Sequence, residues 1–256
     1  MKKNYNLNIK TENTLIFQKK IFLKNGGIAK CIEYENRLFF NFVNLNGKDL
    51  IEFGCGVFPS CIGLNNELMP KSYIATDTSK KILNAAKKND SRPIYKIIDL
   101  EKKIVGKKKY DIIVLKGVLH HTKNPEKILL KLKDILRPNG IIIISEPNLS
   151  SLIGNFLKWF LEFFFKKNLE DSPYGQYNFS KISKSIKKAN LKIHRKWYTS
   201  LILIIFTGDY GRVKFLPDSR LLFGILILFE NIFYKIFSFL KIDKFLNFKL
   251  NLIIKP

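Results

Sequence analysis

Short apolar runs alternate with amphipathic stretches between Lys48 and Pro147. The runs are rich in Ile, Val and Leu and end at turn-forming residues, which is typical of buried strands in a parallel sheet joined by helical crossovers. The predicted strands span residues 49–53, 73–77, 94–98, 110–115 and 141–146. This order predicts an α/β fold with a doubly wound sheet.

Capping residues mark the helices between these strands. Thr78 and Ser79 predict the start of a helix through Ala86. Asn124, followed by a proline and an acid, predicts the start of a second helix, which we expect to reach Leu136. The next four residues, 137–140, carry a proline and a glycine and should turn the chain into the following strand.

Two predicted helices beyond Ser150, at residues 152–166 and 219–242, are apolar around most of their circumference. Their narrow polar sides consist of Asn155, Lys158, Glu162 and Lys166 in the first helix and Glu230, Tyr234, Ser238 and Lys241 in the second. Both carry mid-segment charges, and the first is too short to cross a bilayer core of about 30 Å. Two interpretations stay open, namely contact with a membrane surface or a hydrophobic lid over the core or substrate site.

The chain therefore divides into three parts. A helical lead-in occupies residues 1–46, the alternating core occupies 47–150, and the C-terminal part, 151–256, completes the sheet. The C-terminal part should contain a helix at 178–190, strands at 191–206 and 249–254, and a long connection at 207–247 with a turn at 208–211.

The charge balance is strongly basic. The net charge is +24, but the basic residues are 39 lysines and only 6 arginines. Because recognition of bases and phosphates favours arginine, a nucleic-acid partner is disfavoured. A lysine-rich solvated surface, or attraction to anionic lipid or glycan, accounts for the charge better.

The three cysteines, Cys31, Cys55 and Cys61, form no paired motif. An odd, unpaired set suits neither a disulfide framework nor a metal site, so we expect no metal and a reducing cytoplasm. The N-terminal residues lack the apolar run of a signal peptide, so we do not expect export.

The segment 49–56 carries the most informative chemistry, because a buried strand delivers an acid and two glycines into a turn. A dinucleotide-binding fingerprint would need a third glycine at position 59, where the chain has Pro59. Nicotinamide and flavin enzymes are therefore disfavoured.

This segment resembles motif I of the class I S-adenosylmethionine-dependent methyltransferases, written acid-x-G-x-G-x-G. Glu52, Gly54 and Gly56 match the motif, and Phe58 departs from it at the third glycine. The resemblance implies a Rossmann-like seven-stranded sheet of order 3-2-1-4-5-7-6 whose last strand is antiparallel. It also implies that residues 47–150 bind S-adenosylmethionine.

Further segments match the same family in order. Residues 73–77 end in an acid for the cofactor ribose, 97–100 place an acid near the adenine, 110–121 resemble the stretch after the fourth strand of small-molecule and lipid methyltransferases, and 136–147 resemble the turn into the fifth strand. The cofactor-binding residues that the resemblance implies are Glu52, Phe53, Gly54, Cys55, Gly56, Asp77, Thr78, Asp99, Leu100, Lys116 and Gly117.

A general base is needed only where the acceptor loses a proton. His121 is the first candidate, since imidazole titrates near neutrality, and Glu146 is the second. The alternatives are that His121 only caps a turn and that Glu146 accepts a structural hydrogen bond. Tyr174 and Tyr177 are candidates for contact with substrate.

We therefore expect a methyltransferase acting on a hydrophobic or lipid-linked small molecule or glycan, with a preference for O-methylation. The expected location is the cytoplasm, with an anionic inner membrane face as a candidate partner. A soluble small-metabolite methyltransferase and a non-catalytic binding module that keeps the fold remain alternatives.

Overall fold

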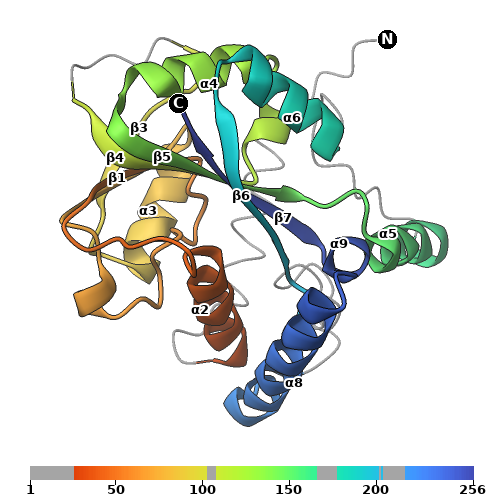
Figure 1. Cartoon of the computed structure of the whole chain (residues 1–256). Coiled ribbons are helices and arrows are strands. Elements are labelled where there is room, and N and C mark those ends of the chain that lie inside the picture. The colour runs from red at the N-terminus through yellow and green to blue at the C-terminus, as the bar shows by residue number, and fades with distance from the viewer. Residues whose placement is uncertain (1–25, 103–107, 166–177, 202, 204–216) are drawn as a thin grey trace.

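The computed structural model describes residues 26–102, 108–165, 178–201, 203 and 217–256, with side chains of Leu161 and Phe165 left aside. Within these residues one seven-stranded sheet crosses the molecule in the order β3-β2-β1-β4-β5-β7-β6 (Figure 1). The strand β7 runs antiparallel to the other six, which confirms the predicted order and direction. The strands are β1 (Asp49–Phe53), β2 (Ser72–Asp77), β3 (Ile94–Ile97), β4 (Tyr110–Lys116), β5 (Leu136–Pro147), β6 (Lys192–Thr199) and β7 (Lys249–Lys255).

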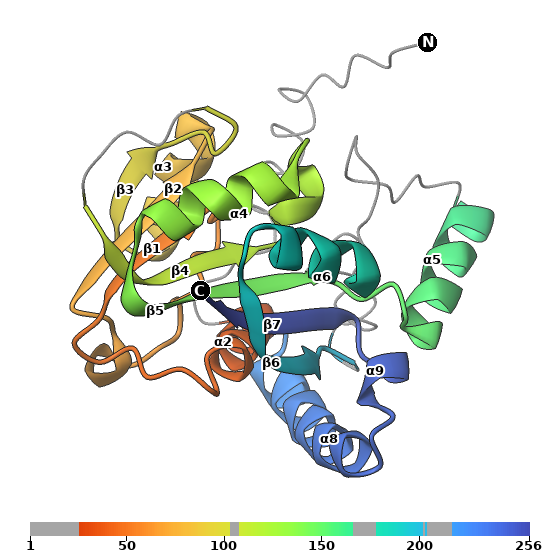
Figure 2. The same cartoon turned by 45° about the horizontal axis from the view of Figure 1, so that its top comes forward.

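Helices cover both faces of the sheet (Figure 2). One face packs against α4 and α6, and the other packs against α2 and α3. The described helices are α2 (Gly27–Phe39), α3 (Lys80–Asn89), α4 (Pro125–Asp134), α5 (Leu152–Phe165), α6 (Phe179–Lys188), α8 (Arg220–Phe239) and α9 (Asp243–Leu246), with short 3-10 turns at Asn66–Leu68 and Leu119–His121.

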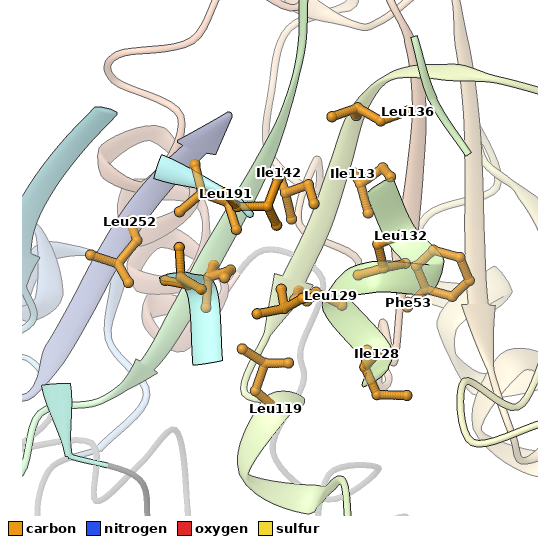
Figure 3. Close-up of a cluster of buried hydrophobic side chains, with 14 of the residues drawn as sticks. Phe53, Ile113, Leu119, Ile128, Leu129, Leu132, Leu136, Ile142, Leu191 and Leu252 are labelled. Carbon is orange, nitrogen blue, oxygen red and sulfur yellow. The ribbon is translucent and has the colours of Figure 1, made fainter. Parts of the chain in front are cut away.

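The larger core lies under α4 (Figure 3). Ile128, Leu129 and Leu132 recur on one side of this helix and pack towards Phe53 and Ile113 of the sheet. All five side chains are almost completely buried, and each such burial contributes about 1.5–3 kcal/mol of transfer free energy. This core fixes the central strands whose ends carry the site.

The predicted helix caps are confirmed. Ser79 Oγ accepts a hydrogen bond from Ile82 N at 3.4 Å, and Asn124 Oδ1 accepts one from Lys127 N at 3.1 Å. Both satisfy donors that the first helical turn leaves without a partner.

The predicted end of the second helix is wrong. The helix α4 ends at Asp134, and Leu136 already belongs to β5. Arg137 holds this stretch against the sheet, because its guanidinium binds Asp49 and Asp111 at 2.6 Å each. The residues expected to form a turn are thus part of β5, with a shifted register and Asn139 at a φ of 61°.

The C-terminal part completes the sheet as predicted, but the predicted extent of the strand at 191–206 is wrong. The strand β6 ends at Thr199, and Ser200 leaves it with a φ of 67°. The helices α8 and α9 are inserted between β6 and β7, and α2 falls within the expected helical lead-in. The expected turn at 208–211, residues 1–25 of the lead-in, Lys166, Tyr174 and Tyr177 lie outside the described residues.

Candidate active site

The carboxyl ends of β1, β2, β3 and β4 meet at one edge of the sheet. Phe53 pairs with Thr76 of β2 and with Leu115 of β4, and Asp77 pairs with Ile97 of β3. The sequence-predicted residues that follow these strands are therefore brought together. In open α/β sheets, ligands bind outside this edge, at the point where the strand order reverses.

Two glycines shape the turn after β1. Gly54 and Gly56 have φ values of 65° and 58°, which favour glycine. A Cβ on Gly54 would lie 2.7 Å from a methyl group of Val118, so this position is closed by protein. A Cβ on Gly56 would have no atom within 4 Å. The backbone of Gly56 therefore borders open space that a ligand can approach.

Asp77 lies beside this turn, at the end of β2. Its two carboxylate oxygens accept hydrogen bonds from Gly56 N at 3.2 Å and from Ser79 N at 3.0 Å. Burial raises the pKa of Asp77, while these amide bonds and Thr78 oppose the rise. A carboxylate presents two acceptor oxygens, the chemistry that a pair of ribose hydroxyls requires, although Thr78 also bonds this one. The open space at Gly56 and this carboxylate fit the predicted cofactor.

Glu52 lies deeper than the prediction implied. Its carboxylate is fully buried and accepts hydrogen bonds from Ser60 N at 3.0 Å, from Ser60 Oγ at 2.5 Å and from the hydroxyl of Tyr73. Burial raises its pKa. These contacts show a carboxylate that holds the loop after Gly56 in place. The sequence analysis missed Ser60 and Tyr73 as its partners.

Three other predicted cofactor residues point their side chains into the protein. Phe53, Cys55 and Leu100 are buried among apolar neighbours. Cys55 N also donates to Thr76 O at 2.8 Å, which ties the turn to β2. Side-chain contact of these three residues with a ligand would need rearrangement, so only their backbone is placed for such a role.

Asp99 follows β3 and remains half-exposed. Ile98 N donates to Asp77 O at 3.1 Å, which places Asp99 just beyond the end of β2. One carboxylate oxygen of Asp99 accepts from Glu101 N at 2.9 Å, and the other lies 3.8 Å from the Lys102 ammonium. Asp99 is thus partly accessible beyond the sheet edge, and its role toward the adenine stays a prediction.

Lys116 at the end of β4 joins the sheet to α2. Its Nζ donates to Asn36 Oδ1 at 2.5 Å, and burial together with Lys249 lowers its pKa from 10.5 to about 8. In the same region, Glu35 accepts from Ser200 Oγ at 2.5 Å and from Lys249 Nζ. This largely buried polar network joins α2 to the carboxyl end of β4 and to β7. The sequence analysis missed Glu35 and Asn36, because nothing in the pattern of α2 separates them from ordinary surface residues.

Gly117 turns the chain at the same edge. Its φ is 68°, and its N–H donates to Ser145 O of β5 at 2.7 Å. The Gly117 amide is therefore already bonded within the sheet and is not available to a ligand. A ligand can approach only the space beside the Gly117 Cα. A Cβ there would come no nearer than 3.8 Å to His120.

Glu146 and His121, the two predicted catalytic residues, have different surroundings. The carboxylate of Glu146 is buried, and its Oε1 accepts from Val118 N at 3.1 Å and Leu119 N at 2.8 Å. Its Oε2 lies 2.5 Å from His120 Nδ1. His121 is exposed, and its ring centroid lies 4.0 Å from that of His120, with the two rings tilted by 42°. The geometry makes Glu146 the organiser of the loop after β4 and leaves His121 accessible.

Comparison with known proteins agrees with this geometry. The model of a methyltransferase domain family matches residues 27–192, which include every residue of the cofactor edge. The chain belongs to the methyltransferase domain family. It is an S-adenosylmethionine-dependent methyltransferase.

Solved structures share the fold at low identity. The magnesium protoporphyrin IX methyltransferase of Synechocystis with bound S-adenosylhomocysteine is 16% identical, with a TM-score of 0.56 over 97% of this chain and 94% of the other. The cyclase SpnF is 11% identical, with a TM-score of 0.54 over 87% and 80%. Because one fold is found in proteins with such different names, the acceptor must be argued from the site of this methyltransferase.

Curated relatives are much longer proteins. The hybrid PKS-NRPS synthetase iccA of Talaromyces variabilis is 29% identical over 153 residues, which cover 54% of this chain. The chain spans only 4% of the length of that relative.

Proposed function

We propose that this methyltransferase acts on a hydroxyl of a hydrophobic or lipid-linked acceptor, such as a quinone-like lipid or a lipid-carried glycan. The observation that carries the proposal is the exposed apolar surface of α5 and α8. The helix α5 begins four residues after β5 ends, at the same sheet edge as the cofactor residues (Figure 1). An acceptor with a long apolar part would find its complement beside the site.

The cofactor would be held by the turn at Gly54–Gly56 and by the carboxylates of Asp77 and Asp99. When bound, S-adenosylmethionine supplies a methyl group already activated by its sulfonium. The chain then has to orient the acceptor and exclude water, and orientation contributes about 7–11 kcal/mol in favourable intramolecular cases. Lys116, which is partly exposed at the end of β4, and the loop organised by Glu146 are the parts available for this task.

His121 is the proposed general base for the acceptor hydroxyl. Its ring is exposed at the carboxyl edge, whereas Glu146 would have to release the Val118 and Leu119 amides before taking a proton. We expect His121→Gln to lower kcat by about 10²–10⁴ with the cofactor affinity unchanged. Glu146→Gln should instead lower stability, because one acceptor of the loop is weakened.

The names of the curated relatives supply a second candidate. They are polyketide synthases and hybrid synthetases, so a polyketide is the alternative acceptor. Such an acceptor is also hydrophobic. Treating the methylated product with alkali would show which atom carries the methyl group, because a methyl ester is hydrolysed whereas an ether or a carbon-bound methyl group is stable.

Calorimetric titration with S-adenosylmethionine tests the enzyme proposal. Asp77→Ala should weaken binding about 100-fold or more, because it removes charged acceptors from two hydroxyls and loosens the amide of Gly56. Asp134→Ala, an exposed aspartate at the end of α4, is the matched control and should bind as the wild type does. A folded wild type that binds no S-adenosylmethionine would favour the non-catalytic alternative.

A further inference from the structure

The helices α5 and α8 expose continuous apolar stripes, which together we term the outer face. Their members recur every three or four residues along one side of each helix. They are Leu152, Phe156, Trp159 and Phe163 on α5 and Leu221, Ile225, Leu228, Ile232, Ile236 and Phe239 on α8. Leu221 and Phe239, near the two ends of α8, are 78% and 85% exposed. Single exposed apolar residues are ordinary, but a contiguous set of this kind marks an interaction surface.

The polarity of α8 is inverted relative to a helix that faces water. Its mid-helix carboxylate, Glu230, is 2% exposed and points into the protein. It accepts hydrogen bonds from Leu201 N at 2.7 Å and from Leu203 N at 3.1 Å. A water-facing helix places charge outside and apolar residues inside. The outer side of α8 is therefore suited to an apolar medium.

The helix α5 also exposes large aromatic side chains. Lys158 and Glu162 lie 3.9 Å apart and are both partly exposed, and Trp159, which neighbours them on the helix surface, is 54% exposed. Its ring stacks at 5.7 Å on Phe163 and lies 5.8 Å from Phe156. Aromatic side chains of this kind are enriched where a protein meets the interface of a bilayer.

The two helices are tied into one unit by α9. Asn148, just before α5, donates through Nδ2 to Lys244 O and Asn247 O, each at 2.7 Å. Ser151 Oγ donates to Leu246 O at 3.0 Å. Figures 1 and 2 both show α5, α9 and α8 in succession at the end of β5 and the start of β7. The outer face is thus held rigidly at the edge of the sheet that carries the site.

The charges around the outer face indicate which apolar environment it contacts. Within residues 152–165 and 220–246, the most exposed charged residues are basic, namely Arg220, Lys235, Lys241 and Lys244, whereas Glu162 and Asp243 are only partly exposed. Long basic side chains can bury their stems and place their charges at lipid headgroups. A cytoplasmic leaflet rich in anionic lipid provides both the apolar layer and the negative charge.

The attachment of α8 excludes a spanning arrangement for this fold. By length and composition alone α8 could cross a membrane, and it is the one such helix among the described residues. However, Asp218 at its start accepts from Ile28 N of α2 at 2.9 Å, Phe223 is buried against α2, and Glu230 binds the chain after β6. A helix fixed at its start and its centre lies along the domain and presents one side outwards.

We propose that the outer face of α5 and α8 is a membrane seat that inserts into one leaflet of an anionic bilayer, in the plane of the interface. The seat places the cofactor edge at the depth where a lipid-carried acceptor presents its headgroup. The part concerning the acceptor rests on the proposed function, whereas lipid binding itself does not.

The two tryptophans of the chain provide a direct probe. Trp197 is buried, and Trp159 lies on the outer face. In a Trp197→Phe variant, the emission of Trp159 should shift to shorter wavelength when phosphatidylglycerol-containing vesicles are added, and lipids brominated near the headgroup should quench it. If that variant does not fold, the difference between wild type and Trp159→Phe gives the same signal. No shift with any vesicle would overturn the proposal.

Flotation with vesicles of phosphatidylcholine, with and without phosphatidylglycerol, tests the residues. Leu228→Glu should weaken partitioning about tenfold or more, because it replaces an inserted apolar side chain with a charge. Ile94→Glu is the matched control, since Ile94 is 57% exposed against 59% for Leu228 but lies on β3, at the opposite end of the strand order. Equal partitioning of both variants would overturn the proposal, as would a dimer in solution that Leu228→Glu dissociates.

Titration of the same samples with S-adenosylmethionine in the absence of lipid separates the two proposals. Leu228→Glu should bind the cofactor as the wild type does. Lipid binding without cofactor binding would reject the enzyme function alone, and cofactor binding without lipid binding would reject the membrane seat alone.

Discussion

The side chains at the carboxyl edge of the sheet and those on the outer face of α5 and α8 have opposite surroundings. At the edge, the buried carboxylates of Glu52, Asp77 and Glu146 accept hydrogen bonds from named amides and hydroxyls of the protein. On the outer face, large apolar side chains such as Leu221 and Phe239 remain exposed. In the first region these three buried carboxylates already have protein partners. The second is complete only in an environment that covers it.

The largest effect on stability should come from Glu230, which ties α8 to the chain that follows β6. Glu230→Ala should lower the free energy of unfolding by about 2–4 kcal/mol, because the Leu201 and Leu203 amides lose their acceptor in a buried place. Urea denaturation followed by circular dichroism measures this change. Glu162→Ala on α5 removes only a partly exposed ion pair and should cost less than about 1 kcal/mol. Similar losses in both variants would show that the inward polarity of α8 does not hold the helix in place.

The two open glycines separate strain from ligand space. Gly56 and Gly47 have φ values of 58° and 72°, and a Cβ on either would meet no atom within 4 Å. Alanine at either position should therefore lower the free energy of unfolding by about 1–2 kcal/mol, because both residues adopt the left-handed backbone conformation. Only Gly56→Ala should weaken S-adenosylmethionine binding, by about tenfold or more, since its methyl group would occupy ligand space. Equal affinities would place the cofactor elsewhere.

A smaller effect concerns pH and Lys116. The pKa of Lys116 is lowered to about 8 by burial and by Lys249, while Asn36, Glu35 and Glu52 face the same ammonium group. Between pH 8 and 10.5 the unfolded chain binds more protons at this lysine than the folded chain does, so its contribution to stability rises with pH. Lys116→Met should remove this rise, which is about 1–2 kcal/mol after allowance for partial exposure.

Denaturation curves over this pH range measure the difference between the Lys116→Met variant and the wild type. Lys71→Met, at an exposed position, controls for the loss of one positive charge. A constant difference between Lys116→Met and the wild type across the range would contradict a depressed pKa at this site.

Much of the fold could be predicted because it depends on local patterns. The apolar runs between Lys48 and Pro147 predicted the strands, and the acids at their ends came together because parallel strands end at one edge. The start of α4 was predicted because Asn124 caps it with its own side chain. Its end was missed because Arg137 is held by Asp49 and Asp111, which lie 88 and 26 residues away.

The candidate site could be predicted only in part for the same reason. Spacing identified Glu52 but did not show that Ser60 and Tyr73 already use its carboxylate. A helical pattern gave α8 a polar side, but only the packed structure shows that Glu230 of this side faces inwards. The roles of His121 and Glu146 likewise depend on exposure, which the sequence does not contain.

Transfer of a labelled methyl group measures directly whether the acceptor of this methyltransferase is hydrophobic. The wild-type chain would be incubated with membranes and S-adenosylmethionine carrying a labelled methyl group, and the product would be partitioned between organic and aqueous phases. We predict that the label enters the organic phase. The Asp77→Ala variant should abolish this incorporation, while the Asp134→Ala variant should preserve it. Label that enters only water-soluble material, from a protein that binds S-adenosylmethionine, would contradict a hydrophobic acceptor.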